Sequence, residues 1–205
     1  MSSFVSAVAA GPRTRGRPTV LDPEAVSAAA LALWSERGYA DTGWAELAEA
    51  TGISVRTLTR HFGTKSALAW VGVQGATDRL RTALAELPEQ LPVNEAVRRG
   101  ILASMAHGGL EQDEGRRWLR LIAVEPELAA TAPEGYAPWT QALSEYLRSR
   151  LPHADDAVCG ALAAGYQVMT FHALAAWAGE GGAGSAAEAV SALLDYVAIP
   201  AAVQQ

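Results

Sequence analysis

Cysteine is almost absent from this chain of 205 residues, which contains only Cys159. A single thiol cannot form an intramolecular disulfide, and this excludes the disulfide-stapled frameworks of small secreted domains. The N-terminus also lacks a basic start followed by a continuous apolar core, because Gly11 and Pro12 interrupt it, so no export signal is read there. We therefore expect a cytoplasmic protein.

The residue patterns that support catalysis or metal binding are missing as well. The four histidines and Cys159 show no zinc-ligand spacing, and the chain has no nucleophile elbow and no nucleotide-binding fingerprint. The glycine-rich run 179–184 lacks the Lys-Ser/Thr pair and the preceding strand of a phosphate-binding loop, so we interpret it as a connection between helices. We expect no enzymatic activity, no catalytic residue, no metal site and no cofactor.

The alternation of apolar and polar residues that is typical of β-strands is also missing. Ala, Leu, Glu and Arg instead recur at intervals of three and four residues, which predicts an all-α fold. Caps, glycines and prolines divide the chain into about nine helices in total. The expected ranges are 22–37, 42–52, 54–61, 65–86, 93–107, 114–131, 134–150, 155–179 and 186–198.

One stretch, residues 157–179, contains no charged residue and is long enough to span a bilayer. Alanine and glycine dominate it, and Gln167, Thr170 and His172 lie inside it, so its transfer into lipid is less favourable than that of a Leu/Ile/Val segment. A helix that is uncharged on all sides is more simply explained as one buried between other helices. We expect no membrane association.

Charge is unevenly distributed along the chain. The formal net charge is -6, which for the whole chain argues against a nucleic-acid partner. Residues 1–70, however, hold seven basic and six acidic side chains, so the acidity belongs to the remainder of the chain. A nucleic-acid partner for the N-terminal part therefore remains compatible with the composition.

Residues 42–62 carry the pattern of a helix-turn-helix. Ala48 supplies the small residue where two helices cross, Gly52 the turn residue that tolerates a positive φ, and Leu58 the apolar anchor of the second helix. An ordinary helical hairpin would also explain the small residue and the glycine. It would not explain the polar and basic outward face, which consists of Arg56, Thr57, Thr59, Arg60 and His61.

The same segment resembles the DNA-binding signature of the TetR family of bacterial regulators. The resemblance covers about residues 22–68, whereas the remaining two thirds of the chain resemble the family only in helical character and length. The matching residues, in order, are Trp44, Leu47, Ala48, Thr51, Gly52, Ile53, Ser54, Thr57, Leu58, His61, Phe62, Lys65 and Leu68.

This resemblance implies a role for each polar residue of the segment. The helix from Ser54 to His61 would enter the major groove of double-stranded operator DNA, where Arg56 can donate a bidentate pair to guanine. The family most often has Tyr at the position of Thr59, and Arg60 is a candidate to replace part of that contact. Val55, Arg56 and Thr59 would then lie nearest the bases, and Thr42, Thr57, His61 and Lys65 would contact phosphates. For His61 the alternative is a core position beside Phe62.

The segment before the first helix carries arginine at every second position, at Arg13, Arg15 and Arg17. We interpret it as a flexible arm that inserts into the minor groove, as arms at this position do in homeodomains. The alternative is a solvated tail in a chain that uses fifteen arginines and one lysine.

The remainder of the chain, which the resemblance identifies as an effector-binding and dimerisation domain, holds most of the large aromatic residues. Candidates for the wall of an apolar ligand pocket are Trp118, Trp139, Tyr166, Met169 and His172, with a purely structural core role as the alternative. Small residues between about 155 and 198 suit close packing of two helices from each subunit of a homodimer. Two subunits are also needed to read two half-sites.

Together these observations predict a ligand-responsive, homodimeric DNA-binding transcriptional regulator. By resemblance it would be a repressor that a small apolar or amphipathic effector releases from a palindromic operator. The expected organisation is an arm over 1–18, a helix-turn-helix domain over 19–66 and an effector-binding and dimerisation domain over 67–205. A helical interaction module of the same fold that has lost DNA binding is the alternative.

Overall fold

The computed structural model describes residues 21–106, 109–197 and 199. Within these residues the backbone forms ten α-helices and one 3-10 helix and no strand, which confirms the all-α prediction. The elements are α1 (Pro23–Arg37), α2 (Trp44–Thr51), α3 (Val55–Phe62), η1 (Ser66–Trp70), α4 (Val71–Glu86), α5 (Val93–Met105), α6 (Asp113–Val124), α7 (Pro126–Gly135), α8 (Ala137–Arg150), α9 (Asp156–Gly179) and α10 (Ala186–Leu194).

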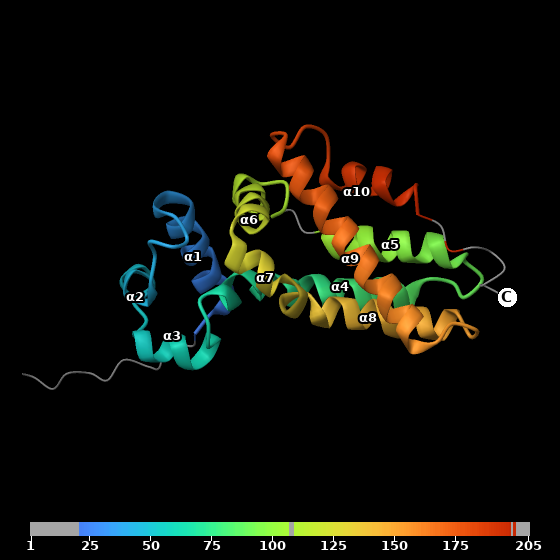
Figure 1. Ribbon diagram of the computed structural model, residues 1–205, viewed down its shortest axis with the longest axis horizontal. Coiled ribbons are helices and arrows are strands. Elements are labelled where there is room, and N and C mark those ends of the chain that lie inside the picture. The colour runs from blue at the N-terminus through green and yellow to red at the C-terminus, as the bar shows by residue number, and fades with distance from the viewer. Residues whose placement is uncertain (1–20, 107–108, 198, 200–205) are drawn as a thin grey trace, which may run out of the picture.

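Helices α1 to α3 lie together at one end of the molecule (Figure 1). The Asp22 side chain caps α1 by accepting hydrogen bonds from the backbone N–H groups of Glu24 and Ala25, as the sequence predicts. The expected range 42–52 begins one residue before the N-cap of α2. Gly43 is the N-cap residue, and its N–H donates to the Glu46 carboxylate at 2.9 Å.

Helix α4 leads from this end into the rest of the protein, where it packs against α5 and α8 (Figure 1). The expected helix over 65–86 begins with the 3-10 turn η1 before it becomes α-helical at Val71. Helices α4 and α5 approach closely at Gly100, where an added Cβ would lie 2.6 Å from Leu84 Cδ2. A larger residue at this crossing would force the Leu84 side chain to shift.

The single helix expected over 114–131 is two helices, α6 and α7, joined at Glu125. Glu125 has extended backbone angles (φ -84°, ψ 113°), and Pro126 follows it. Proline lacks an N–H group and disfavours a helical conformation in the residue before it, so the chain turns here.

Helix α9 packs against α8, α6 and α10, and it crosses the long axis of the C-terminal part (Figure 1). It is the one helix among the described residues that is long and apolar enough to cross a membrane by length and composition, which alone is weak evidence for a span. The expectation that it is buried on all sides was wrong, because a row of uncharged side chains faces outward. We call this row the α9 stripe; it consists of Ala157, Val158, Ala161, Ala164, Val168, His172 and Ala176.

Candidate DNA-binding surface and ligand cavity

The turn between α2 and α3 has the geometry that the sequence predicts. Gly52 adopts the left-handed conformation (φ 67°, ψ 12°), and the Ser54 side chain caps α3 by accepting the N–H of Thr57 at 3.3 Å. Leu47 of α2 and Leu58 of α3 are completely buried between the helices. These contacts hold α3 from behind and leave its opposite face in solvent.

The outward face of α3 is polar and positively charged. Arg56, Arg60 and His61 are exposed and α3 contains no acidic residue, so two arginines face solvent without an acidic neighbour on their own helix. Val55, at the start of the helix, is 41% exposed. Such a face offers donors for both phosphate and base edges.

The two threonines of this helix are partly buried, and their hydroxyls are engaged locally. Thr59 Oγ1 donates to the Val55 carbonyl at 3.0 Å, so in this conformation the hydroxyl is turned toward its own helix. Thr57 Oγ1 lies 2.9 Å from Ser54 Oγ at the helix cap. At Thr59 the methyl group is thus left for a partner, whereas the Thr57 hydroxyl can accept from Ser54 and donate its own proton to a partner.

Thr42 is buried at this end of the molecule, and Lys65 is half-buried with its ammonium turned toward the backbone. Lys65 Nζ donates to the carbonyls of Tyr39 at 2.6 Å and Thr42 at 3.0 Å, and it lies 3.8 Å from the centre of the Tyr39 ring. Thr42 is fully buried, and its hydroxyl donates to the Gly38 carbonyl at 2.9 Å. The structure therefore does not bring these two side chains onto the outward face of α3, where a phosphate contact would be made.

The arm with Arg13, Arg15 and Arg17 lies outside the described residues. Its predicted minor-groove role therefore remains a prediction.

Three side-chain hydrogen bonds hold α6 and α7 to η1 and to the loop between α1 and α2. Two come from indoles: Trp70 Nε1 donates to Thr131 Oγ1 at 3.1 Å, and Trp118 Nε1 donates to the Ala69 carbonyl at 2.7 Å. The third joins Tyr39 and Glu127 at 2.7 Å. The connection around η1 is thus held from both α6 and α7.

A cavity of about 610 Å³ lies beside this junction. Its wall includes Trp118 of α6, Trp139 of α8 and Phe171 of α9, and Gly72 of α4 contributes no side chain to it. Helix α1 also reaches the cavity, through Glu24, Ser27, Ala28 and Leu31. A molecule in the cavity would therefore touch both the first helix of the DNA-binding end and the helices behind it.

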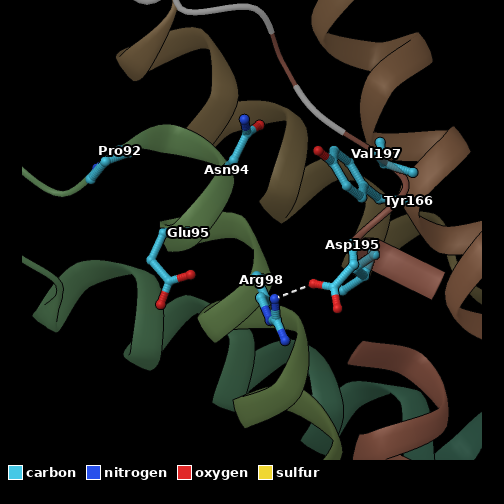
Figure 2. Close-up of a pocket in the computed structure, with 8 residues that line it drawn as sticks. Pro92, Asn94, Glu95, Arg98, Tyr166, Asp195 and Val197 are labelled. Carbon is cyan, nitrogen blue, oxygen red and sulfur yellow. Dashed lines mark hydrogen bonds and ion pairs between the residues drawn. The ribbon is translucent and has the colours of Figure 1, made fainter. Parts of the chain in front are cut away.

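The structure brings two of the five predicted ligand residues to this cavity, Trp118 and Trp139. Met169 and His172 do not line it, and His172 is exposed in the α9 stripe. Tyr166 lines a separate, smaller cavity of about 240 Å³ between α5, α9 and α10 (Figure 2). In this second cavity Arg98 is paired with Asp195, so its cation is already neutralised.

Two sequence models of protein families match the chain. The model of bacterial regulatory proteins of the tetR family matches residues 27–69, and the model of the MftR C-terminal domain matches residues 91–201, more than half of the chain. The chain belongs to the TetR family of bacterial regulatory proteins. It is a TetR-family transcriptional regulator with a DNA-binding helix-turn-helix.

One relative of this TetR-family chain is MftR of Mycobacterium tuberculosis, named as a regulator of mycofactocin biosynthesis. The two are 27% identical over 135 residues, which are 66% of this chain and 68% of the relative. This match extends beyond the helix-turn-helix into the C-terminal part.

Solved structures of the TetR family share the fold. FadR of Thermus thermophilus, a repressor crystallised with lauroyl-CoA, has a TM-score of 0.59 at 22% identity, covering 88% of this chain and 97% of its own. A regulator from Pseudomonas aeruginosa has a TM-score of 0.58 at 15% identity, covering 88% and 92%. A TetR-family regulator from Rhodococcus sp. has a TM-score of 0.56 at 19% identity, covering 89% and 98%. All three neighbours are named as transcriptional regulators or repressors.

Several residues that line the cavity of this TetR-family protein were not predicted from the sequence. Phe171 and Leu174 follow Thr170 on α9 by one and four residues, and they share a helix face with Gln167. Their helical spacing is the sequence signal that could have identified them as cavity residues. The α1 residues carry no such signal, because their exposure to the cavity depends on how α1 meets α4 and α6. Gly72 and Gly75 of α4 line the cavity without side chains, and they thereby leave space for a ligand.

Proposed function

We propose that this protein is a homodimeric, ligand-responsive repressor that binds a palindromic operator through α3. The observation that carries the proposal is the outward face of α3, which presents Arg56 and Arg60 to solvent while Leu58 anchors the helix from behind. Arg56, Val55 and the Thr59 methyl group would meet base edges in the major groove. Arg60, His61 and Thr57 would position the helix on the phosphates.

The family resemblance implies that Lys65 and Thr42 contact phosphates. We propose instead that both residues have a structural role. The Lys65 ammonium already donates to two backbone carbonyls, and breaking those bonds to reach a phosphate would leave the carbonyls without a donor. We propose that Lys65 stabilises the loop before α2. Arg13, Arg15 and Arg17 would add the minor-groove contact.

The proposed organisation keeps an arm over 1–18, a DNA-binding domain over 19–66 and an effector-binding and dimerisation domain over 67–205. Dimerisation through about 155–198 is supported by the α9 stripe, an uncharged helix face exposed to solvent. Val168 in this stripe is 61% exposed and Val158 is 46% exposed. Contiguous apolar surface of this kind is typical of a protein interface.

The dimer is tested by placing a charge in the stripe. Val168→Glu is expected to convert a dimer into a monomer in sedimentation-velocity experiments at micromolar concentration, because the glutamate would be buried without a partner. Val124→Glu is the matched control, because Val124 is 72% exposed on α6 and lies outside the stripe. A dimer that survives Val168→Glu, or a wild-type protein that is monomeric, would contradict this part of the proposal.

The effector is proposed to bind in the cavity beside α1. It would be a small apolar or amphipathic molecule, since tryptophan and phenylalanine side chains form much of the wall. The lauroyl-CoA bound to the Thermus relative supports including long-chain acyl thioesters among the compounds to test. A ligand releases DNA only if it binds the released conformation more tightly than the DNA-bound one.

The wall contributed by α1 supplies a route for such coupling. Ser27 lines the cavity, and its hydroxyl donates to the Leu68 carbonyl at 2.8 Å, so it ties α1 to η1. A ligand that wedges between α1 and α4 would move α1 and, through the α1–α2 contact, the recognition helix α3. In a dimer such a movement changes the spacing of the two recognition helices.

The function is tested by footprinting the purified protein on the DNA upstream of its own coding region. We expect a protected palindrome whose protection disappears on titration with an effector, tested first with lauroyl-CoA and related acyl thioesters. Gly72→Leu should make operator binding insensitive to the effector, because a Cβ at Gly72 meets nothing within 4 Å and the leucine would fill the cavity. Absence of protection by the wild-type dimer would contradict the proposed function.

A further inference from the structure

The α9 wall of the larger cavity contains a buried hydroxyl without a hydrogen-bond partner. Thr170 is 7% exposed, and among the described residues its Oγ1 has no donor or acceptor within reach. Three other helical threonines, Thr51, Thr77 and Thr131, each donate to the carbonyl four residues earlier. An unpartnered buried hydroxyl is unfavourable, so Thr170 calls for an explanation.

The surroundings of Thr170 place it within reach of a ligand. Thr170 lines the cavity together with Gln167, one turn earlier on α9, and with its neighbour Phe171. Its hydroxyl oxygen is covered in the present rotamer. Rotation by 120° about the Cα–Cβ bond carries the hydroxyl into the position that the methyl group or the hydrogen now holds, so another staggered rotamer can present a donor to a molecule that fills the cavity.

Tyr136 adds a second hydroxyl to this part of the wall. Its ring packs against Phe171, with ring centres 6.1 Å apart, and edge-on against Trp70 at 5.4 Å. Burial raises the pKa of Tyr136 well above its ordinary value, and neither a hydrogen bond nor a nearby charge contributes to that shift. The Tyr136 hydroxyl therefore stays neutral at physiological pH.

The charged side chains that line the cavity come from other helices, α1, α4 and α6. Glu24 of α1 and Glu114 of α6 are exposed, and the half-buried Arg79 donates its Nε–H to the Ser104 carbonyl at 3.0 Å. The polar side chains that α9 and Tyr136 contribute to the wall are thus two hydroxyls and one amide, which are all neutral. An ionised ligand group placed there would lose its hydration without gaining a counter-charge.

We infer that Thr170, Tyr136 and Gln167 bind an uncharged hydrogen-bonding group, a carbonyl or a hydroxyl, of an otherwise apolar ligand. This inference rests on the proposed function in one respect, that the cavity is the effector site. The aromatic wall accommodates the apolar body of the ligand, and the three neutral side chains select its polar group. A ligand with a carboxylate in the same place is disfavoured.

The test uses the full-length protein and three probes that share one ring system: naphthalene, 2-naphthol and 2-naphthoate. Each is titrated against bound 1-aminoanthracene, whose fluorescence reports occupancy of an apolar site. The wild type should bind 2-naphthol more tightly than naphthalene, and 2-naphthoate more weakly than 2-naphthol. Thr170→Val removes the hydroxyl at nearly constant shape and should weaken 2-naphthol about three- to tenfold, the range of one hydrogen bond.

Two further variants make the test specific. Thr170→Ser keeps the hydroxyl and should retain the preference for 2-naphthol over naphthalene. Tyr136→Phe keeps the ring contacts and should reduce that preference as Thr170→Val does. In every variant naphthalene should bind within about twofold of its wild-type affinity, because naphthalene has no hydrogen-bonding group that a lost hydroxyl could affect. Thermal unfolding shows whether each variant is folded. If either Thr170→Val or Tyr136→Phe is misfolded, the binding preference of the other variant decides the outcome.

Equal binding of 2-naphthol and naphthalene by the wild type would overturn the inference, as would a preference that persists in both Thr170→Val and Tyr136→Phe. If an effector still releases the operator in that case, the proposed function stands and only this inference fails. If 1-aminoanthracene does not bind the wild type at all, the inference and the effector role of the cavity fail together.

Discussion

The hydroxyl of Tyr39 donates a hydrogen bond of 2.7 Å to Glu127 Oε1, across 88 positions of the chain. Tyr39 lies in the loop between α1 and α2, whereas Glu127 lies in the first turn of α7. The same tyrosine packs edge-on against Trp34, with ring centres 4.9 Å apart, and its carbonyl accepts from Lys65 Nζ. One residue thus joins the core of the DNA-binding end to the C-terminal helices.

Tyr39→Phe should separate this link from the ring packing. Phenylalanine retains the contacts with Trp34 and removes only the bond to Glu127, so the free energy of unfolding should fall by about 1 kcal/mol. Urea denaturation at neutral pH measures the change. Glu127→Gln, which keeps an acceptor for the hydroxyl, should lose less. A Tyr39→Phe protein as stable as the wild type would show that this bond contributes nothing to the junction.

Stability at alkaline pH should depend on the buried tyrosines. Burial, chiefly, raises the folded-state pKa of Tyr39 and Tyr136 above the ordinary value of about 10. Above that pH the unfolded chain releases these protons while the folded protein retains them, so unfolding becomes more favourable as pH rises. Below about pH 9 both states are protonated and these groups cause no pH dependence.

Urea midpoints measured between pH 8 and pH 11 test this expectation. The midpoint should fall as pH rises above about 10, and the fall should be shallower in Tyr39→Phe and Tyr136→Phe. An identical alkaline slope in wild type and both variants would contradict the assignment of the effect to these two residues.

Gly135→Ala should destabilise the protein through Trp70. A Cβ added at Gly135 would lie 2.4 Å from Trp70 Cδ2, and the Trp70 indole is also held by Thr131. Overpacking of this kind lowers the free energy of unfolding by about 1–3 kcal/mol. Gly72→Ala is the matched control, because a Cβ there meets nothing within 4 Å and alanine favours a helix by about 1 kcal/mol. A Gly135→Ala protein as stable as Gly72→Ala would be inconsistent with the packing described.

Lys65→Met should lower stability rather than remove a DNA contact. Methionine keeps most of the apolar stem but leaves the Tyr39 and Thr42 carbonyls without their donor, so we expect a loss of about 1–3 kcal/mol. Operator affinity per folded molecule should stay within about threefold of wild type, well under the tenfold step of 1.4 kcal/mol. Wild-type stability combined with strongly reduced affinity would restore the phosphate contact that the family resemblance implies.

Local sequence signals were sufficient for the helix-turn-helix. Asp22 and Ser54 cap their helices through neighbours two or three residues away, and Gly52 needs only its own backbone freedom. Pro126 could also have placed the break between α6 and α7, since its effect is confined to the adjacent residue. Features governed by contacts this close in sequence can be read from the sequence alone.

Features that depend on distant contacts could not be read in this way. The sequence motif predicts that Lys65 is a surface cation that contacts phosphate. Its hydrogen-bond partners are carbonyls 23 and 26 residues earlier, and only the folded loop brings them close to Lys65. The cavity is harder still to predict, because it exists where packing leaves space between α1, α4, α6 and α9. Trp118 and Trp139 line it, whereas His172, on the same helix as Phe171, faces outward.

The central claim, that the exposed face of α3 binds operator DNA, is tested most directly by fluorescence anisotropy with a labelled duplex from the upstream region. Wild type and Arg56→Ala should be compared at 50 mM and 200 mM salt. We expect wild-type affinity to fall steeply with salt, and Arg56→Ala to bind about 10- to 100-fold more weakly with unchanged thermal stability. Wild-type binding that is absent or insensitive to salt, or an Arg56→Ala protein that binds as tightly as wild type, would contradict the claim and favour a helical module that has lost DNA binding.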